Sequence, residues 1–218
     1  MICGIDEAGR GPVLGPLVVA GITLEDDLKL KEYRVKDSKK ITPKRRETLS
    51  KKIQEIASNY EILVIPAKDI DDMRRVMTLN EIEVNAFIKV IKKLKPDTCY
   101  VDSADVNEKR FGMNILSGLS FKPDIISKHK ADSIYPIVSA ASILAKTRRD
   151  QEVQKIEQNL ENKLNLPLGS GYPADPITQK FLKTWLKRFG ELPPHTRHSW
   201  KTAQNILKEK NVRKLDGF

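Results

Sequence analysis

Hydrophobic residues in the first part of the chain fall into short runs separated by polar turns, a pattern that predicts β-strands. The runs at 2–5 and 17–24 flank a glycine-rich segment and predict an antiparallel hairpin. Similar runs at 60–65, 98–101 and 125–128 predict three further strands. Together they indicate a five-stranded sheet.

Between and after these runs, the apolar positions take the spacing of amphipathic helices. Residues 79–94 carry the strongest periodicity, and Thr42 before Pro43 has the residue types of an N-cap and a first helical position. A hairpin followed by alternating strands and helices predicts an α/β fold with a mixed sheet flanked by helices. The helix that begins at Pro43 is expected to run to about 57, and the other helices are expected near 69–78, 108–119, 136–164, 181–189 and 203–207.

The clearest linker is LPLGSGYPADP, with three prolines and two glycines in residues 166–176. It predicts a main α/β domain over residues 1–165 and a linker with a small C-terminal helical subdomain over 166–218. A chain of 218 residues is long enough for one sizeable domain and such an appendage.

The charge balance narrows the class of partner. Lys and Arg number 39 against 29 Asp and Glu, a formal net charge of +10 that favours nucleic acid first and an acidic membrane second. No segment approaches the roughly 20 apolar residues of a membrane helix, and an acidic pair ends the first apolar run. Cys3 and Cys99 lie in apolar runs and fit buried thiols of a reduced, cytoplasmic protein.

Acidic residues follow several predicted strands. Asp6 and Glu7 end the first, Asp102 ends the fourth, and Asp132 lies just beyond the fifth. Ligands of α/β sheets gather at strand ends, and converging carboxylates need cations such as Mg²⁺ or Mn²⁺. The alternative is structural: a solvated acidic turn at Asp6 and Glu7, and capping roles for Asp102 and Asp132.

A basic glycine turn follows the first acidic pair. Gly9 and Gly11 allow the backbone around Arg10 to approach an anionic or hydroxyl-bearing ligand closely. Lys39 in DSKK and Lys146 on the small-residue helix are candidate phosphate contacts. The small residues of that helix, which include Ser139 and Ser142, favour close helix packing over a hydroxyl-donor role.

Several segments together resemble the motifs of type 2 ribonuclease H, known as ribonuclease HII. They occur in the family's order between residues 1 and 176, and the helical tail resembles the compact archaeal form. The resemblance implies a ribonuclease H-like fold and a metal-dependent endonuclease that cuts the RNA strand of RNA/DNA hybrids and single ribonucleotides in duplex DNA. The segments are IDEAGRGPVLGP, VKDSKKI, YVDSADVN, HKADSIYPIVSAASILAKTRRD and GSGYPADP.

The resemblance also implies roles for individual residues. Asp6, Glu7, Asp102 and Asp132 would hold two Mg²⁺ or Mn²⁺ ions and form the catalytic set. Gly9, Arg10 and Gly11 would read the 2′-hydroxyl beside the scissile bond, the group that separates RNA from DNA. Tyr172 would stack on the sugar; the alternative is a linker tyrosine that covers the core.

The expected mechanism follows from these ions. One activates a water that attacks the phosphorus 5′ of a ribonucleotide, and the other stabilises the departing 3′ oxygen, leaving a 3′-hydroxyl and a 5′-phosphate. Two rival functions remain open. A non-catalytic hybrid-binding module would not need the acids, and another two-metal nuclease or strand-transfer enzyme would not need the 2′-hydroxyl reader.

The chain ends in VRKLDGF, which resembles a degraded form of the peptide that docks replication proteins on the sliding clamp. The glutamine and second aromatic residue of that peptide are absent, so a frayed helix end is the favoured interpretation. A monomer is the default oligomeric state.

Overall fold

The computed structural model describes residues 1–33, 35 and 41–215 of the chain. It comprises two compact units, each described separately below. The first, here called the sheet unit, contains residues 1–8, 18–64 and 77–149; the second, the helical unit, contains 9–17, 65–76 and 150–218. The domain boundary predicted between residues 165 and 166 stays a prediction.

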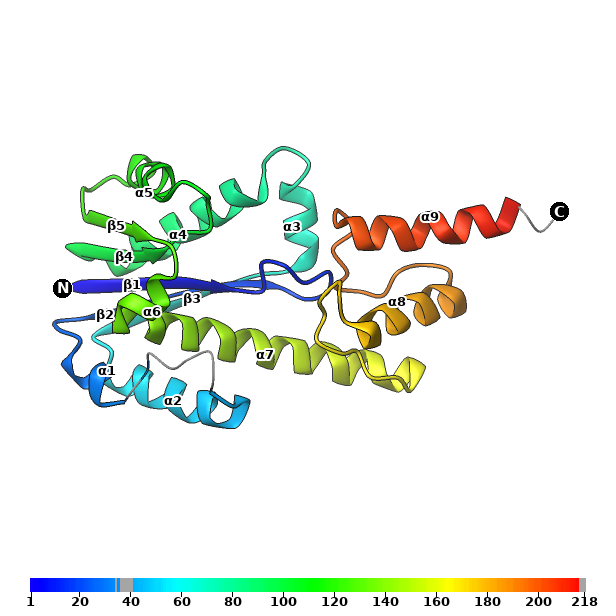
Figure 1. Ribbon diagram of the computed structural model, residues 1–218, viewed down its shortest axis with the longest axis horizontal. Coiled ribbons are helices and arrows are strands. Elements are labelled where there is room, and N and C mark those ends of the chain that lie inside the picture. The colour runs from blue at the N-terminus through cyan, green and yellow to red at the C-terminus, as the bar shows by residue number, and fades with distance from the viewer. Residues whose placement is uncertain (34, 36–40, 216–218) are drawn as a thin grey trace. The chain divides into compact units, whose positions relative to one another are not determined.

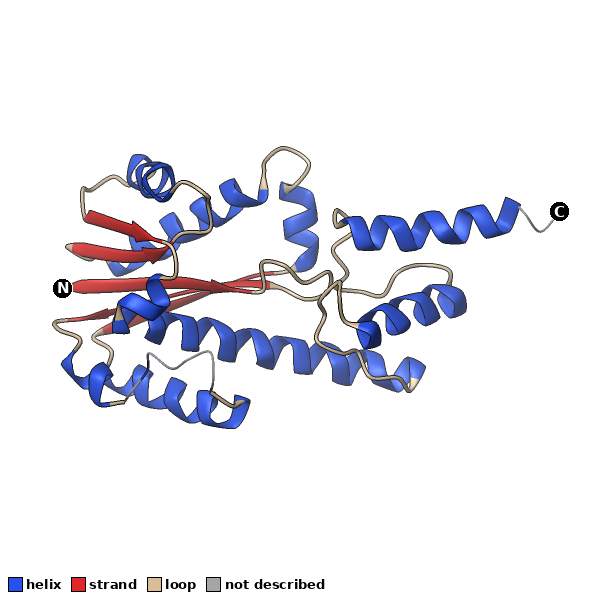
Figure 2. Ribbon diagram, in the orientation of Figure 1, coloured by secondary structure: helices blue, strands red, loops and turns tan. Residues whose placement is uncertain are grey.

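The strands form one five-stranded sheet in the order β3-β2-β1-β4-β5, drawn in red in Figure 2. β1 pairs antiparallel with β2 and parallel with β4, and β4 pairs parallel with β5. The predicted hairpin and mixed sheet are therefore confirmed. The bounds are β1 Ile2–Ala8, β2 Leu17–Leu24, β3 Asn59–Ile65, β4 Thr98–Asp102 and β5 Asp124–Lys128.

Helices cover both faces of this sheet (Figure 1): α4 and α5 lie on one side, and α1, α2 and the first part of α7 on the other. Side-chain caps fix two helix starts: Thr42 accepts from the Arg45 N–H, as predicted, and Thr78 forms a capping box with Glu81. The helices are α1 Leu28–Glu32, α2 Pro43–Ile56, α4 Leu79–Leu94, α5 Glu108–Ser117, α6 Ala131–Ile134 and α7 Pro136–Leu164.

The small residues of α7 bring its backbone against β1. A Cβ built on Gly4 would overlap the backbone of Ile137, so this approach requires a glycine in the strand. Ser139 and Ser142 are fully buried in the same helix. The predicted close packing is confirmed, and it places the helix that carries Lys146 beside the strand that carries Asp6.

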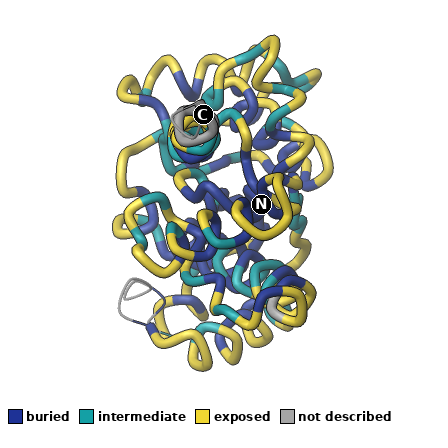
Figure 3. The backbone as a smooth tube through the Cα atoms, turned by 90° about the vertical axis from the view of Figure 1, so that its right-hand side faces the viewer, coloured by how far each residue is buried: buried dark blue, intermediate teal, exposed yellow. Residues whose placement is uncertain are grey.

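The helical unit contains α3 Ala67–Met73, α8 Pro176–Phe189, α9 Lys201–Leu215 and the remainder of α7. Its core joins Val13 and Leu14 of the N-terminal turn to apolar side chains of α7, α8 and α9, among them Leu160 and Phe181. Figure 3 colours the chain by this burial. Among the described residues, no helix combines the length and the apolar character needed to cross a membrane.

Candidate active site

Two of the predicted acids lie on neighbouring parallel strands. Ile5 of β1 is paired with Val101 of β4, and Asp6 and Asp102 each follow by one residue. Strand β1 continues through Glu7 to Ala8 because these residues remain paired with β2. The parallel register therefore brings Asp6 and Asp102 to the same point of the sheet.

The environment of Asp6 disfavours its charged form. The side chain is only 4% exposed, and burial, followed by the negative charge of Asp102, raises its pKa to about 7. Three groups act in the opposite direction: the Ser142 hydroxyl, the Lys146 ammonium and the Glu7 N–H, which donates to Asp6 Oδ1 at 2.7 Å. A cation between Asp6 and Asp102 would relieve the repulsion that raises this pKa.

A third acid is tied to Asp102 through the backbone. The Ala131 N–H donates to Asp102 Oδ1 at 2.9 Å, and Asp132, 4% exposed, is the next residue in α6. Glu7 is half-buried on β1. Within the described residues, no group of three or more His, Cys, Asp or Glu side chains is arranged to hold a metal ion, so the metal assignment stays a prediction.

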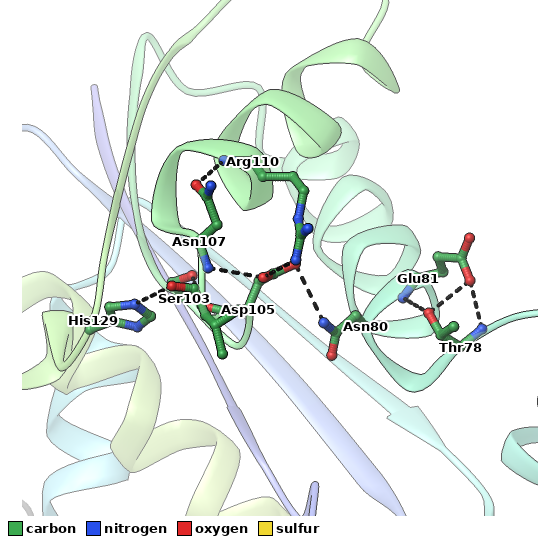
Figure 4. A network of polar contacts seen from close by, with 9 residues as sticks. Thr78, Asn80, Glu81, Ser103, Asp105, Asn107, Arg110 and His129 are labelled. Atoms are coloured by element: carbon green, nitrogen blue, oxygen red, sulfur yellow. Dashed lines mark hydrogen bonds and ion pairs between the residues drawn. The ribbon is translucent and has the colours of Figure 1, made fainter.

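The loop that follows Asp102 is fixed by a polar network around Asp105 (Figure 4). Asp105 accepts from Arg110 Nε at 3.1 Å, from the Asn107 N–H at 2.9 Å and from Asn80 Nδ2 at 3.4 Å. The hydrogen bond from Arg110 is the main reason that the pKa of Asp105 is lowered. Asp105 was not among the site residues predicted from the sequence.

The predicted reader of the 2′-hydroxyl lies in the helical unit. Gly9 has φ 89°, in the left-handed region that favours glycine. A Cβ on Gly11 would lie 3.5 Å from Cε1 of Tyr172, so the tyrosine ring flanks this glycine. The structure thus places side by side the glycine turn and the tyrosine ring that the resemblance assigns to the sugar. Tyr172 is 44% exposed, so its ring is accessible to a ligand.

Backbone hydrogen bonds hold this turn against two later segments. The N–H groups of Val13 and Leu14 donate to Gly171 O at 2.8 and 3.3 Å, and the Gly15 N–H donates to His195 O at 2.9 Å. The segment PPHTRHSW, residues 193–200, forms turns rather than a helix. The histidines of that segment receive no catalytic role.

Two predicted phosphate contacts have different outcomes. Lys146 lies on α7, where its charge acts on Asp6, and it stays a predicted phosphate contact. Lys39 lies outside the described residues. Arg197 and Trp200, which contact the glycine turn, were not predicted as site residues from the sequence.

Comparisons with known proteins agree over almost the whole chain. A family model described as ribonuclease HII matches residues 3–203. The ribonuclease HII of Thermococcus sibiricus is 49% identical over 224 residues, which cover 99% of this chain and 96% of the relative.

Two solved structures extend this agreement to three dimensions. The crystal structure of the ribonuclease H2 from Pyrococcus horikoshii OT3 matches with 42% identity and a TM-score of 0.88, covering 96% of this chain and 98% of that one. The PCNA:RNase HII complex from Archaeoglobus fulgidus matches with 40% identity and a TM-score of 0.85, covering 94% and 96%. This chain therefore shares the fold of both.

Proposed function

The chain belongs to the ribonuclease HII family, whose members are metal-dependent endonucleases acting on RNA/DNA hybrids, and we propose that it cuts 5′ of a ribonucleotide paired with DNA. The family and the ribonuclease H-like fold predicted from the motifs are confirmed. The proposal adds the position of the cut and its products, a 3′-hydroxyl and a 5′-phosphate.

The single observation that carries the proposal is the Asp6–Asp102 pair, a buried carboxylate next to another acid on two neighbouring parallel strands. With Glu7 and Asp132 it would hold two Mg²⁺ or Mn²⁺ ions, because carboxylate oxygens suit hard divalent cations. When bound, these ions supply a water of lowered pKa and neutralise charge on the leaving oxygen. The four carboxylates would fix the positions of the ions, and the positive charge of Lys146 would attract a phosphate of the substrate.

Recognition of the ribose is assigned to Gly9, Arg10, Gly11 and Tyr172. The flexible glycines let backbone N–H groups reach a hydroxyl that DNA lacks, and the tyrosine offers a flat face to the sugar. The position of the Tyr172 ring, which a Cβ at Gly11 would meet, supports this assignment. In the sequence only Ala8 separates the acidic pair from the turn.

We also propose a sliding clamp as a protein partner of the C-terminus. The solved Archaeoglobus fulgidus structure is a complex with PCNA, and this chain ends in VRKLDGF. Its last three residues lie outside the described residues. If the proposal is right, Phe218→Ala weakens binding to an immobilised clamp while cleavage of free substrate is unchanged; clamp binding equal to wild type removes the proposal.

The decisive experiment uses a labelled DNA duplex with one ribonucleotide, incubated with Mg²⁺, Mn²⁺ or EDTA. A matched all-DNA duplex and a longer RNA/DNA hybrid serve as controls. We expect metal-dependent cleavage 5′ of the ribonucleotide, cleavage of the hybrid, no cut in the all-DNA duplex and no product in EDTA.

The alternatives predict different products. Cleavage of the all-DNA duplex would keep the metal site but contradict the reader of the 2′-hydroxyl, as another two-metal nuclease would behave. Binding without cleavage in either metal would support a hybrid-binding module.

A further inference from the structure

A buried arginine near the C-terminus holds the glycine turn from within the helical unit. Arg197 is fully buried, yet its guanidinium has three backbone acceptors. It donates to Gly9 O at 2.6 Å, to Arg10 O at 3.0 Å and to Gly15 O at 2.9 Å. A buried charge persists only with such partners, and the planar fork of arginine can reach several carbonyls at once.

Trp200 completes this support. Its indole Nε1 donates to Gly11 O at 3.1 Å, and the Arg197 guanidinium lies 4.7 Å from its ring centroid. The carbonyls of three consecutive residues, Gly9, Arg10 and Gly11, are therefore all held by these two side chains. The arrangement fixes the orientation of successive peptide planes in the turn.

The orientation has a direct consequence for the N–H groups. In a trans peptide the carbonyl and the following N–H point in opposite directions, and the described residues contain no cis peptide bond. Because Gly9 O and Arg10 O point toward Arg197, the N–H groups of Arg10 and Gly11 point away from it. The next residue, Pro12, has no N–H.

We infer that Arg197 and Trp200 are positioning residues for ribose recognition: they hold the turn so that the Arg10 and Gly11 N–H groups face the ribonucleotide. This inference rests on the proposed function, in which the turn reads the 2′-hydroxyl. It explains why a charged side chain is buried here at all, since an apolar residue of similar size would leave three carbonyls unpaired.

The test compares two variants with a matched control. Trp200→Phe keeps an aromatic ring but removes the indole N–H that holds Gly11 O together with the five-membered part of the ring, and Arg197→Lys keeps the charge but loses the fork. Ile206→Ala removes core volume from α9, in the same unit, and leaves unchanged the two side chains that hold the turn. Melting temperatures, kcat/KM and Kd in EDTA are measured for each, with the single-ribonucleotide duplex and its all-DNA counterpart.

The decisive quantity is the ratio of the Kd for the all-DNA duplex to the Kd for the single-ribonucleotide duplex. If the two residues only stabilised the fold, their substitution would leave this ratio unchanged. We expect both turn variants to bring this ratio close to one, to leave the Kd of the all-DNA duplex unchanged, and to lower kcat/KM on the order of tenfold. Ile206→Ala should lower the melting temperature and keep the wild-type ratio.

The outcomes separate this inference from the proposed function. If the wild-type protein cleaves the ribonucleotide duplex but Trp200→Phe and Arg197→Lys keep its Kd ratio, the inference is overturned whatever their stability. Cleavage by a wild-type protein that has no binding preference overturns it as well. If the wild-type protein neither prefers nor cuts the ribonucleotide duplex, the proposed function itself fails.

Discussion

At the scale of single residues, Asp6 is the carboxylate on which the proposed chemistry depends most. It is buried beside Asp102, and burial, followed by the negative charge of Asp102, raises its pKa to about 7. We expect Asp6→Asn to lower turnover by roughly a hundredfold or more, because a ligand of the proposed ions loses its charge. The measurement is single-turnover cleavage of the single-ribonucleotide duplex in Mg²⁺.

Measurements of binding and stability show whether Asp6→Asn loses turnover through the chemical step or through weaker binding or folding. The Kd for the duplex in EDTA should stay at or below the wild-type value and the melting temperature at or above it, since asparagine removes a charge that Asp102 opposes. Asp124→Asn, an exposed aspartate at the start of β5, is the matched control and should retain full turnover. Wild-type turnover by Asp6→Asn would remove Asp6 from the catalytic set.

Residues of the candidate site differ in how well the sequence predicts them. Asp6 and Asp102 are predictable because each follows a short apolar run, and parallel pairing makes those ends neighbours. Arg197 is not, because its acceptors are carbonyls 182 to 188 residues away in the chain. A carbonyl belongs to every residue type, so no side-chain pattern marks the positions that will accept from a buried guanidinium.

At the scale of elements, the periodicity of apolar residues predicted the strands and the long helices. The residues at which they begin and end depend on strand pairing and on helix caps. α4 begins at Leu79 because Thr78 and Glu81 form a capping box. The sequence predicted the helix boundary at this position. β1 extends beyond its apolar run because Asp6 and Glu7 pair with β2. The short helices α1 and α6 were not predicted, since four or five residues carry too little periodicity.

The start of α8 gives a prediction about pH. Asp175 accepts from the Ile177 N–H at 2.9 Å and from the N–H and hydroxyl of Ser170 at 2.6 and 2.7 Å, and the bonds from Ser170 lower its pKa most, to about 2. The folded state therefore favours the carboxylate. Its stabilising effect is present above about pH 4 and is lost as the pH falls through about 2.

The variant Asp175→Asn isolates this contribution. It should lower the free energy of unfolding by about 1 kcal/mol at pH 7, because one acceptor of the Ser170 donors is lost, and the difference should shrink toward pH 2. Urea unfolding at several pH values measures it. Glu191→Gln, an exposed acid beyond α8, changes the same charge and should stay within about 0.5 kcal/mol of wild type. A pH-independent difference for Asp175→Asn would contradict the assignment.

At the scale of the whole molecule, the net charge of +10 and the ribose reader should contribute separately to binding. Phosphate contacts release counterions and do not distinguish ribose from deoxyribose, so log K should fall linearly with log salt, with the same slope for both duplexes. The preference for the ribonucleotide duplex should then be independent of salt. Fluorescence anisotropy in EDTA, across a salt series, measures both quantities.

Lys146 connects this electrostatic property to the site. If it contacts a phosphate, Lys146→Gln should reduce the magnitude of the salt slope by about one and weaken binding to both duplexes equally. Lys89→Gln, an exposed lysine on α4, removes the same charge and should leave the slope unchanged. Equal salt slopes for the two variants would mean that Lys146 contributes only to the overall positive charge and contacts no phosphate. A weakened preference for the ribonucleotide duplex would instead place Lys146 among the groups that read the sugar.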